Sequence, residues 1–159
     1  MSFDDLTELQ TALPGHGAIA GLDLGTATLG VAVSDGFRRV ATPLETIKRK
    51  KFTLDAEQLL KITSQREICG LVLGLPLNMD GTEGPRVQST RAFARNLATV
   101  THLPITFWDE RLSTVAAERA LLEADTTRKR RSEVIDHVAA SYILQGALDR
   151  LAHLEASDD

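Results

Sequence analysis

Short apolar runs separated by turn residues open the chain and predict β-strands. Residues 19–24 are apolar apart from one carboxylate, which is typical of a central strand buried on both faces. After a turn at 25–28, residues 29–35 form a second apolar run, so the two runs predict a hairpin. A third strand is expected around residues 40–48, and Pro43 near its start favours an edge of the sheet.

The pattern of apolar positions then changes to a helical period. Residues 53–66 carry spaced leucines among polar residues, with Asp55 and Gln58 as a cap pair, and predict a helix. Residues 68–75 predict a buried strand, and Pro85 is well placed at the first position of a second helix. The buried face of that helix is predicted to contain Thr90, Phe93, Ala94, Leu97 and Ala98.

The last third of the chain predicts one more strand and two helices. Residues 105–108 form the strand, a short helix capped by Ser113 or Thr114 follows, and Ser132 caps a last helix to about Leu154. A strand meander followed by strand–helix–strand units is typical of an α/β fold. We therefore expect a mixed sheet covered by helices.

Length and composition indicate one domain. The chain has 159 residues, of which 43% are hydrophobic, enough for a single core. Residues 1–17 are polar and acidic and are expected to form a flexible extension, residues 18–154 the domain, and residues 155–159 a polar tail. No apolar run reaches the ~20 residues that span a bilayer, and no signal peptide is recognisable. We expect a cytoplasmic protein without a membrane partner.

Two carboxylates are predicted to lie on buried faces. Asp23 lies inside the first apolar strand, and Asp136 falls within the same arc of the last helix as Ile143. A buried carboxylate costs several kcal/mol unless it is paired or bound to a metal ion. Either acid alone is more simply satisfied by an arginine or by backbone N–H groups. Together with Glu110, just past the fifth strand, they favour a shared site, in which Asp109 is the substitute for Glu110.

The residue types of this site indicate a hard metal ion. Carboxylate oxygens suit Mg²⁺ or Mn²⁺, whereas the single cysteine and the spacing of the four histidines do not form a zinc site. Two such ions about 4 Å apart can activate water and stabilise the leaving oxygen in phosphodiester cleavage. The net charge of −4 argues mildly against a nucleic-acid partner, but basic clusters at 48–51 and 128–131 weigh against that reading if they flank the site.

Several stretches of the chain resemble the YqgF/RuvX family, which comprises pre-16S rRNA nucleases and Holliday junction resolvases. They follow one another in order over about residues 19–150, and one of them is long and idiosyncratic. The matching stretches are 21–26, 30–35, 74–83, 109–114, and 135–136 with 139–140. The resemblance implies an RNase H-like fold, with a five-stranded mixed sheet flanked by helices. It also implies a nuclease site that binds Mg²⁺ or Mn²⁺ through Asp23, Glu110 and Asp136.

Further residues are expected to contact nucleic acid. Thr26 lies in the first turn, and Asn78 and Arg86 lie near a helix N-terminus that can accept an anion. Arg111 either pairs with Glu110 or holds the scissile phosphate. The basic cluster before Asp136 is expected to grip the backbone. It consists of Arg128, Lys129, Arg130 and Arg131.

Other functions are compatible with the sequence. Residues 23–26 also resemble the first phosphate loop of the actin, sugar-kinase and heat-shock-chaperone ATPases, which need a second domain around the nucleotide. A non-catalytic RNA-binding module for ribosome assembly would keep the fold, although the three acids argue against it. Among nuclease functions, processing of the 5′ end of pre-16S rRNA is preferred on the resemblance, and resolution of branched DNA is the alternative. The protein is expected to act as a monomer or homodimer.

Overall fold

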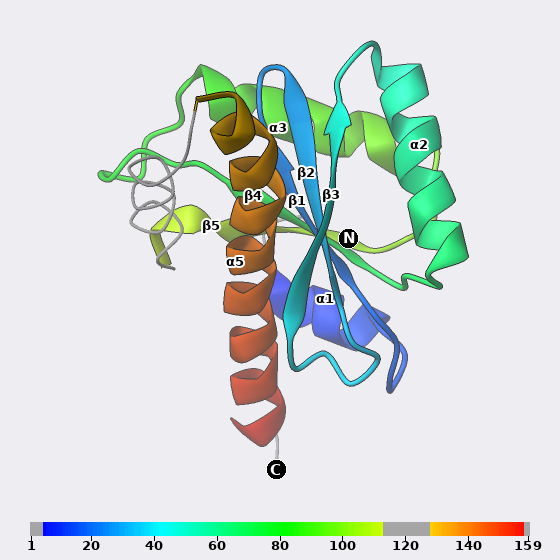
Figure 1. Cartoon of the computed structure of the whole chain (residues 1–159). Coiled ribbons are helices and arrows are strands. Elements are labelled where there is room, and N and C mark those ends of the chain that lie inside the picture. Colours follow the sequence, from blue (N-terminus) through cyan, green and yellow to red (C-terminus); the bar gives the residue numbers. More distant parts are fainter. Residues whose placement is uncertain (1–4, 113–127, 158–159) are drawn as a thin grey trace.

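Five strands form one mixed sheet in the order β3-β2-β1-β4-β5 in the computed structural model (Figure 1). The structure describes the backbone of residues 5–112 and 128–157 and the side chains of residues 5–112 and 137–155. β1, β2 and β3 are antiparallel neighbours, whereas β4 and β5 run parallel to β1. The predicted mixed sheet and the edge position of the strand with Pro43 are therefore confirmed. The strands are β1 (Ala20–Leu24), β2 (Thr28–Ser34), β3 (Ala41–Lys48), β4 (Leu71–Leu75) and β5 (Ile105–Asp109).

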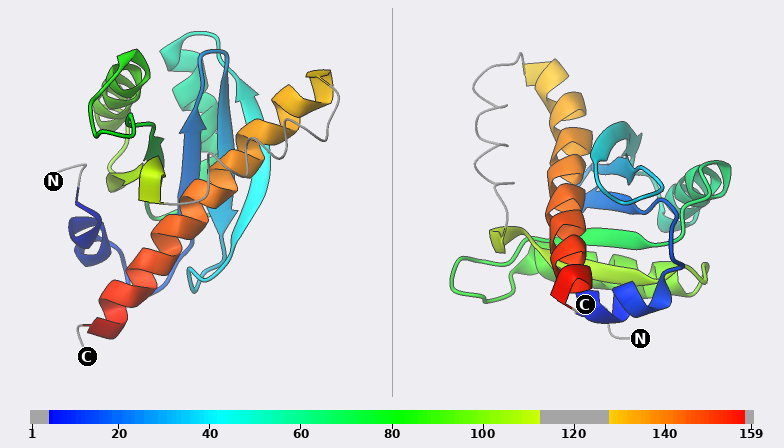
Figure 2. Two further views of the ribbon diagram at one scale, coloured as in Figure 1. Left: turned by 90° about the vertical axis from the view of Figure 1, so that its left-hand side faces the viewer. Right: turned by 90° about the horizontal axis from the view of Figure 1, so that it is seen from below.

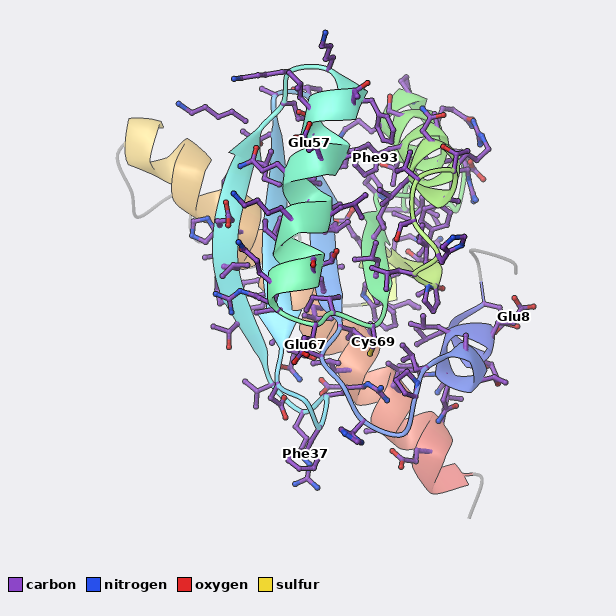
Figure 3. The ribbon with its side chains drawn as sticks, turned by 90° about the vertical axis from the view of Figure 1, so that its right-hand side faces the viewer. Glu8, Phe37, Glu57, Glu67, Cys69 and Phe93 are labelled. Carbon is purple, nitrogen blue, oxygen red and sulfur yellow. The ribbon has the colours of Figure 1, made fainter. Side chains whose placement is uncertain are left out.

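Helices cover both faces of this sheet (Figure 2). α2 (Phe52–Gln65) and α3 (Pro85–Ala98) lie on one face, and the long α5 (Arg128–Ser157) crosses the other. Figure 3 shows Phe93 of α3 in the space between α2 and α3, where its ring meets the edge of Phe52 at a centroid distance of 5.5 Å. None of the helices in the described part of the chain has the length and apolar character needed to cross a membrane.

Alternation along the strands divides the core into two layers. Ala20, Leu22 and Leu24 of β1 belong to the apolar cluster shared with α2 and α3. The residues between them, Gly21 and Asp23, therefore face α5. The apolar layer on that side of the sheet contains Ala32, Val72 and Trp108 from the strands and the inner face of α5.

Glycines allow α5 to lie directly against the backbone of the sheet. A Cβ at Gly21 would lie 2.6 Å from Cβ of Leu144 and 2.9 Å from the carbonyl oxygen of Ala140. A Cβ at Gly74 of β4 would overlap Ile143. The position of α5 over β1 and β4 therefore depends on the absence of side chains at both glycines.

The ends of several elements differ from the sequence-based expectation. α5 already includes residues 128–131, before the expected cap at Ser132, and none of these residues is a helix breaker. α2 is capped at Lys51, and Asp55 instead accepts a hydrogen bond from the backbone N–H of Lys50. β4 begins at Leu71 rather than residue 68. The exposed Ala98 does not belong to the buried face of α3, whose other predicted members are buried. The short helix expected after residue 113 lies outside the described residues.

The N-terminal segment contributes to the core. α1 (Leu6–Ala12) follows an N-cap at Asp5, whose carboxylate accepts a hydrogen bond from the N–H of Thr7. Leu9 is fully buried in the layer beneath α5, although residues 1–17 were expected to form a flexible extension. Leu6, Leu9 and Leu13 have the spacing of one helical face, but they lie in a short, otherwise polar segment, so their packing against the core was not predicted.

We expect Gly21→Ala to destabilise the fold by about 1–3 kcal/mol, because its Cβ would meet the backbone carbonyl of Ala140, which cannot rotate away. Gly36→Ala is the matched control, since no atom lies within 4 Å of the Cβ it would add. Urea unfolding of both variants gives the comparison. Equal midpoints for Gly21→Ala and Gly36→Ala would contradict the proposed packing of α5 on β1.

Candidate active site

Asp23 lies one residue before the end of the central strand β1, with an exposed fraction of 4%. It pairs in register with Gly30 of β2. The parallel register of Leu22 with Leu73 brings Gly74 of β4 level with Asp23 one residue later. The carboxylate therefore lies on the α5 face of the sheet between two strand positions that carry no side chain.

Glu110 reaches the same place from the end of β5. It is the first residue of the short 3-10 helix η1 (Glu110–Leu112) and is half-buried. Its carboxyl carbon lies 3.3 Å from the position that a Cβ on Gly74 would take. Gly74 is level with Asp23 on the neighbouring strand, so the Glu110 carboxyl group and Asp23 adjoin the same glycine on the same face of the sheet. The structure thus brings together two of the three predicted acids.

The backbone of α5 passes the same level of the sheet at residue 136. Ala140 lies against Gly21, and Asp136 precedes it by one helical turn, or about 6 Å. α5 crosses the sheet obliquely (Figure 2), with its first residues towards the carboxyl end of β1 (Figure 1). His137, the residue after Asp136, has its Nδ1 2.9 Å from the hydroxyl of Thr46, which pairs with Gly30 and is therefore level with Asp23. The helix backbone at Asp136 is therefore level with Asp23, and the side chain of Asp136 lies outside the described residues.

Asp109 is engaged by Arg111. The Arg111 guanidinium donates from Nε to both carboxylate oxygens, at 3.0 and 3.1 Å, and from Nη2 at 2.7 Å. These hydrogen bonds from the Arg111 side chain hold the pKa of Asp109 below its ordinary value. Phe107 packs in the layer with α3 and Trp108 in the layer with α5, so alternation turns Asp109 away from the face of Asp23.

Arg111 also holds the loop that follows β4. Its Nη1 donates to the carbonyl oxygen of Met79 at 3.3 Å. Within that loop, Asn78 donates from Nδ2 to the hydroxyl of Thr82 at 2.9 Å, and the N–H of Asn78 donates to the carbonyl of Thr82. Asn78, predicted to contact nucleic acid, thus uses its side chain amide to shape the loop.

The predicted residues Thr26 and Arg86 lie at the end of β1 on the side of α3. Thr26 is exposed in the β1–β2 turn, and Arg86 donates from Nη2 to the carbonyl of Leu24 at 3.3 Å. Beside them, Arg49 donates from Nη1 to the carbonyl of Gly25. The sequence interpretation noted the basic cluster 48–51 but assigned Arg49 no role. The register of β2 with β3 brings Arg49 to this turn, because Lys48 pairs with Thr28.

The last basic cluster lies in the first turns of α5, at the end of the helix that approaches the carboxyl end of β1 (Figure 1). The side chains of Arg128, Lys129, Arg130 and Arg131 lie outside the described residues. Among the side chains that the structure does describe, no group of three or more His, Cys, Asp and Glu gathers for a metal ion. The donor chemistry of Asp23 and Glu110 nevertheless fits a hard divalent cation, since both offer carboxylate oxygens beside Gly74.

The sequence matches the family model described as RuvX, Holliday junction resolvase, over residues 17–150. The chain belongs to the RuvX family. A RuvX relative from Ruegeria pomeroyi is 73% identical over 154 residues, which cover 97% of this chain and all of the relative. One from Rhodobacter capsulatus is 70% identical over 149 residues, 94% of each chain. Both carry the name "Putative pre-16S rRNA nuclease".

A solved structure confirms the fold of this RuvX chain. Thermus thermophilus RuvC in complex with a Holliday junction substrate superposes with a TM-score of 0.51 over 86% of this chain and 96% of that one. The sequence identity is 13%, so the likeness concerns the fold alone. The expected RNase H-like fold and the family resemblance are both confirmed.

We expect Arg111→Gln to raise the pKa of Asp109, because the charged hydrogen bonds that stabilise its carboxylate are lost. A lowered folded-state pKa stabilises the fold above the pKa of the unfolded chain, and this contribution is lost as the pH falls through the folded pKa. In the variant, the free energy of unfolding should therefore decrease less as the pH falls through the pKa of Asp109. Carboxyl NMR titration gives the measurement.

Asp35 serves as the internal reference in the same titration. Its pKa is lowered by backbone N–H groups, chiefly those of Val40 and Arg39, and should not change in the variant. An unchanged pKa of Asp109 in Arg111→Gln would show that the ion pair does not control that carboxylate.

Proposed function

We propose that this RuvX protein is a divalent-metal-dependent nuclease that hydrolyses phosphodiester bonds in processing of the 5′ end of pre-16S rRNA. The observation that carries the proposal is the convergence of Asp23 and Glu110 beside Gly74, on the face covered by α5. The backbone position of Asp136 level with Asp23 supports a third acid there.

Each acid has a different mechanical support. Asp23 pairs with Gly30 of β2, the preceding residue Leu22 pairs with Leu73 of β4, and the burial of Asp23 strengthens its attraction for a cation. Glu110 lies on a short turn, which the adjoining Asp109–Arg111 pair ties to the end of β5. In the proposed site, Asp23 is therefore held by a strand of the sheet, and Glu110 by a turn that the Asp109–Arg111 ion pair stabilises.

Asp23, Glu110 and Asp136 are the residues that would hold Mg²⁺ or Mn²⁺, which supplies activation of water and stabilisation of the leaving oxygen. The protein's own part is to hold the phosphate in line with these acids. Thr26 and Arg86 at the end of β1 and the basic residues at the start of α5 are the groups we assign to the phosphate backbone. Arg111 pairs with Asp109, so we propose that it positions Glu110 by stabilising the turn and does not bind the phosphate itself.

The substrate class is supported by the relatives. Those about 70% identical over nearly the whole chain are named as pre-16S rRNA nucleases, which favours an RNA precursor in the bacterial cytoplasm. The family description and the fold of RuvC favour branched DNA as the second candidate. Both substrates present the same phosphodiester group to the acids.

We expect Asp23→Asn to abolish metal-dependent cleavage while the protein stays folded, because the amide keeps the shape but loses the charge that binds the cation. Purified protein should cut in Mg²⁺ or Mn²⁺, stop on addition of a chelator, and recover with excess metal. Asp149→Asn, at an exposed carboxylate of α5, is the matched control and should cut normally. Full activity of a folded Asp23→Asn protein would refute the site.

We expect Glu110→Gln to lower cleavage at least about 100-fold, whereas Asp109→Asn should stay within about tenfold of the unmodified protein. The reason is that Glu110 lies on the face of Asp23, while Asp109 points away and pairs with Arg111. Initial cleavage rates at saturating metal give the comparison. The reverse order of the two variants would identify Asp109 as the ligand.

The substrate is decided by a side-by-side assay on a pre-16S 5′ leader RNA and a four-way DNA junction, with the Asp23→Asn protein as the blank. Faster cleavage of the leader supports the RNA function, and faster cleavage of the junction supports the alternative. Tight binding of RNA without cleavage in either metal would instead indicate a non-catalytic assembly module.

A further inference from the structure

A small basic pocket lies at the end of β1 on the side opposite to Asp23. It has a volume of about 150 Å³ and is bordered by the β1–β2 turn, the residue after β3 and the first turns of α3. Its lining residues are Leu24, Gly25, Thr26, Arg49, Pro85, Arg86 and Ser89. Two arginines and two hydroxyl-bearing residues thus line the cavity, and none of the lining residues is acidic.

Backbone carbonyls hold both arginines at the rim. Arg49 donates to the carbonyl of Gly25 and Arg86 to that of Leu24, at the two consecutive residues where β1 ends. A guanidinium has five N–H donors, so one bond to a carbonyl orients it and leaves further donors for an anion. Neither arginine forms an ion pair with a carboxylate among the described residues.

The first turn of α3 adds to the positive field of the pocket. α3 has Pro85 at its start, no side chain that caps its N-terminus, and no acidic residue in its first turn. The partial positive charge of this helix end is therefore not offset by the helix's own side chains. This field reinforces the two arginines, which are the main reason to expect an anion.

The pocket and the acids lie on opposite sides of one strand end. Leu24 packs in the layer with α3, whereas Asp23 before it faces α5. A nucleic-acid strand that crosses the end of β1 would place one phosphate at the acids and another at the two arginines. We propose that this pocket, formed chiefly by Arg49, Arg86, Thr26 and Ser89, binds a non-scissile phosphate of the substrate strand. The proposal rests on the proposed nuclease function.

The test measures how tightly the inactive Asp23→Asn protein binds the pre-16S leader RNA at several salt concentrations. Adding Arg49→Gln should weaken binding roughly tenfold and reduce the slope of log Kd against log salt by about one, as for the loss of one phosphate contact. Ser89→Glu is a second variant that keeps both arginines, places a carboxylate at the pocket wall, and should weaken binding similarly.

Arg95→Gln is the matched control, because it also removes one arginine charge. Arg95 is exposed and lies in α3 nine residues after Arg86, away from the pocket. It should leave both the affinity and the salt slope nearly unchanged. An unchanged slope in Arg49→Gln, or an equal loss in Arg95→Gln, would overturn the pocket while the nuclease function could still stand on its cleavage assay.

A titration with inorganic phosphate separates the two proposals. The Nε–Hε NMR signals of Arg49 and Arg86 should shift with phosphate, and those of Arg95 should not. Shifts in a protein that cuts no nucleic acid in either metal would keep the pocket as an anion site and refute the nuclease function. No shift at Arg49 and Arg86, with normal cleavage, would refute the pocket alone.

Discussion

The close contact between α5 and the backbone of the sheet is the constraint on which the candidate site depends. Gly21 and Gly74 allow the helix to lie on β1 and β4 at a distance that any Cβ would prevent. Trp108 adds a third contact, with its indole ring 2.9 Å from the Cβ position of Gly146 on the helix. Because these contacts hold the helix at residues 140–146, they also set the height at which residue 136, one turn earlier, passes the end of β1.

The absence of a side chain at Gly74 also affects the candidate site. Gly74 accommodates both Ile143 of the helix and the carboxyl group of Glu110. A larger residue there would displace the packing and the acid at once. Stability and site geometry are therefore coupled at this position.

The sequence predicted the parts of this arrangement that depend on the spacing of apolar residues within one strand or one helix. The strand with Asp23 is apolar on both faces, and the helix with Asp136 shows a buried arc, so both acids stood out against their surroundings. The choice between Asp109 and Glu110 did not follow from the pattern, because adjacent residues at a strand end differ only in the face they take. The pairing of Asp109 with Arg111 and the side chain of Glu110 over Gly74 favour Glu110.

Contacts between distant elements were the least predictable part. Arg49 lies at the end of β3 and meets the carbonyl of Gly25 only because the hairpin brings the two ends together. Leu9 was not expected to be buried, since it lies in a mostly polar segment and the layer that it joins is formed by distant residues of the sheet and of α5. Such contacts depend on how distant elements are placed against one another. The spacing of apolar residues along the chain does not specify that placement.

At the end of β1, the alternation of side chains places the acids on one face of the sheet and the basic pocket on the other. Asp23 and Leu24 are consecutive, yet one faces the helix that carries Asp136 and the other adjoins the basic pocket beside α3. A one-residue slip of β1 would exchange these faces and bury an acid in the apolar layer with α2 and α3. The antiparallel pairing with β2 and the parallel pairing with β4 both oppose that slip. The register of this strand therefore fixes on which side of the sheet the acids lie and on which side a phosphate can be held.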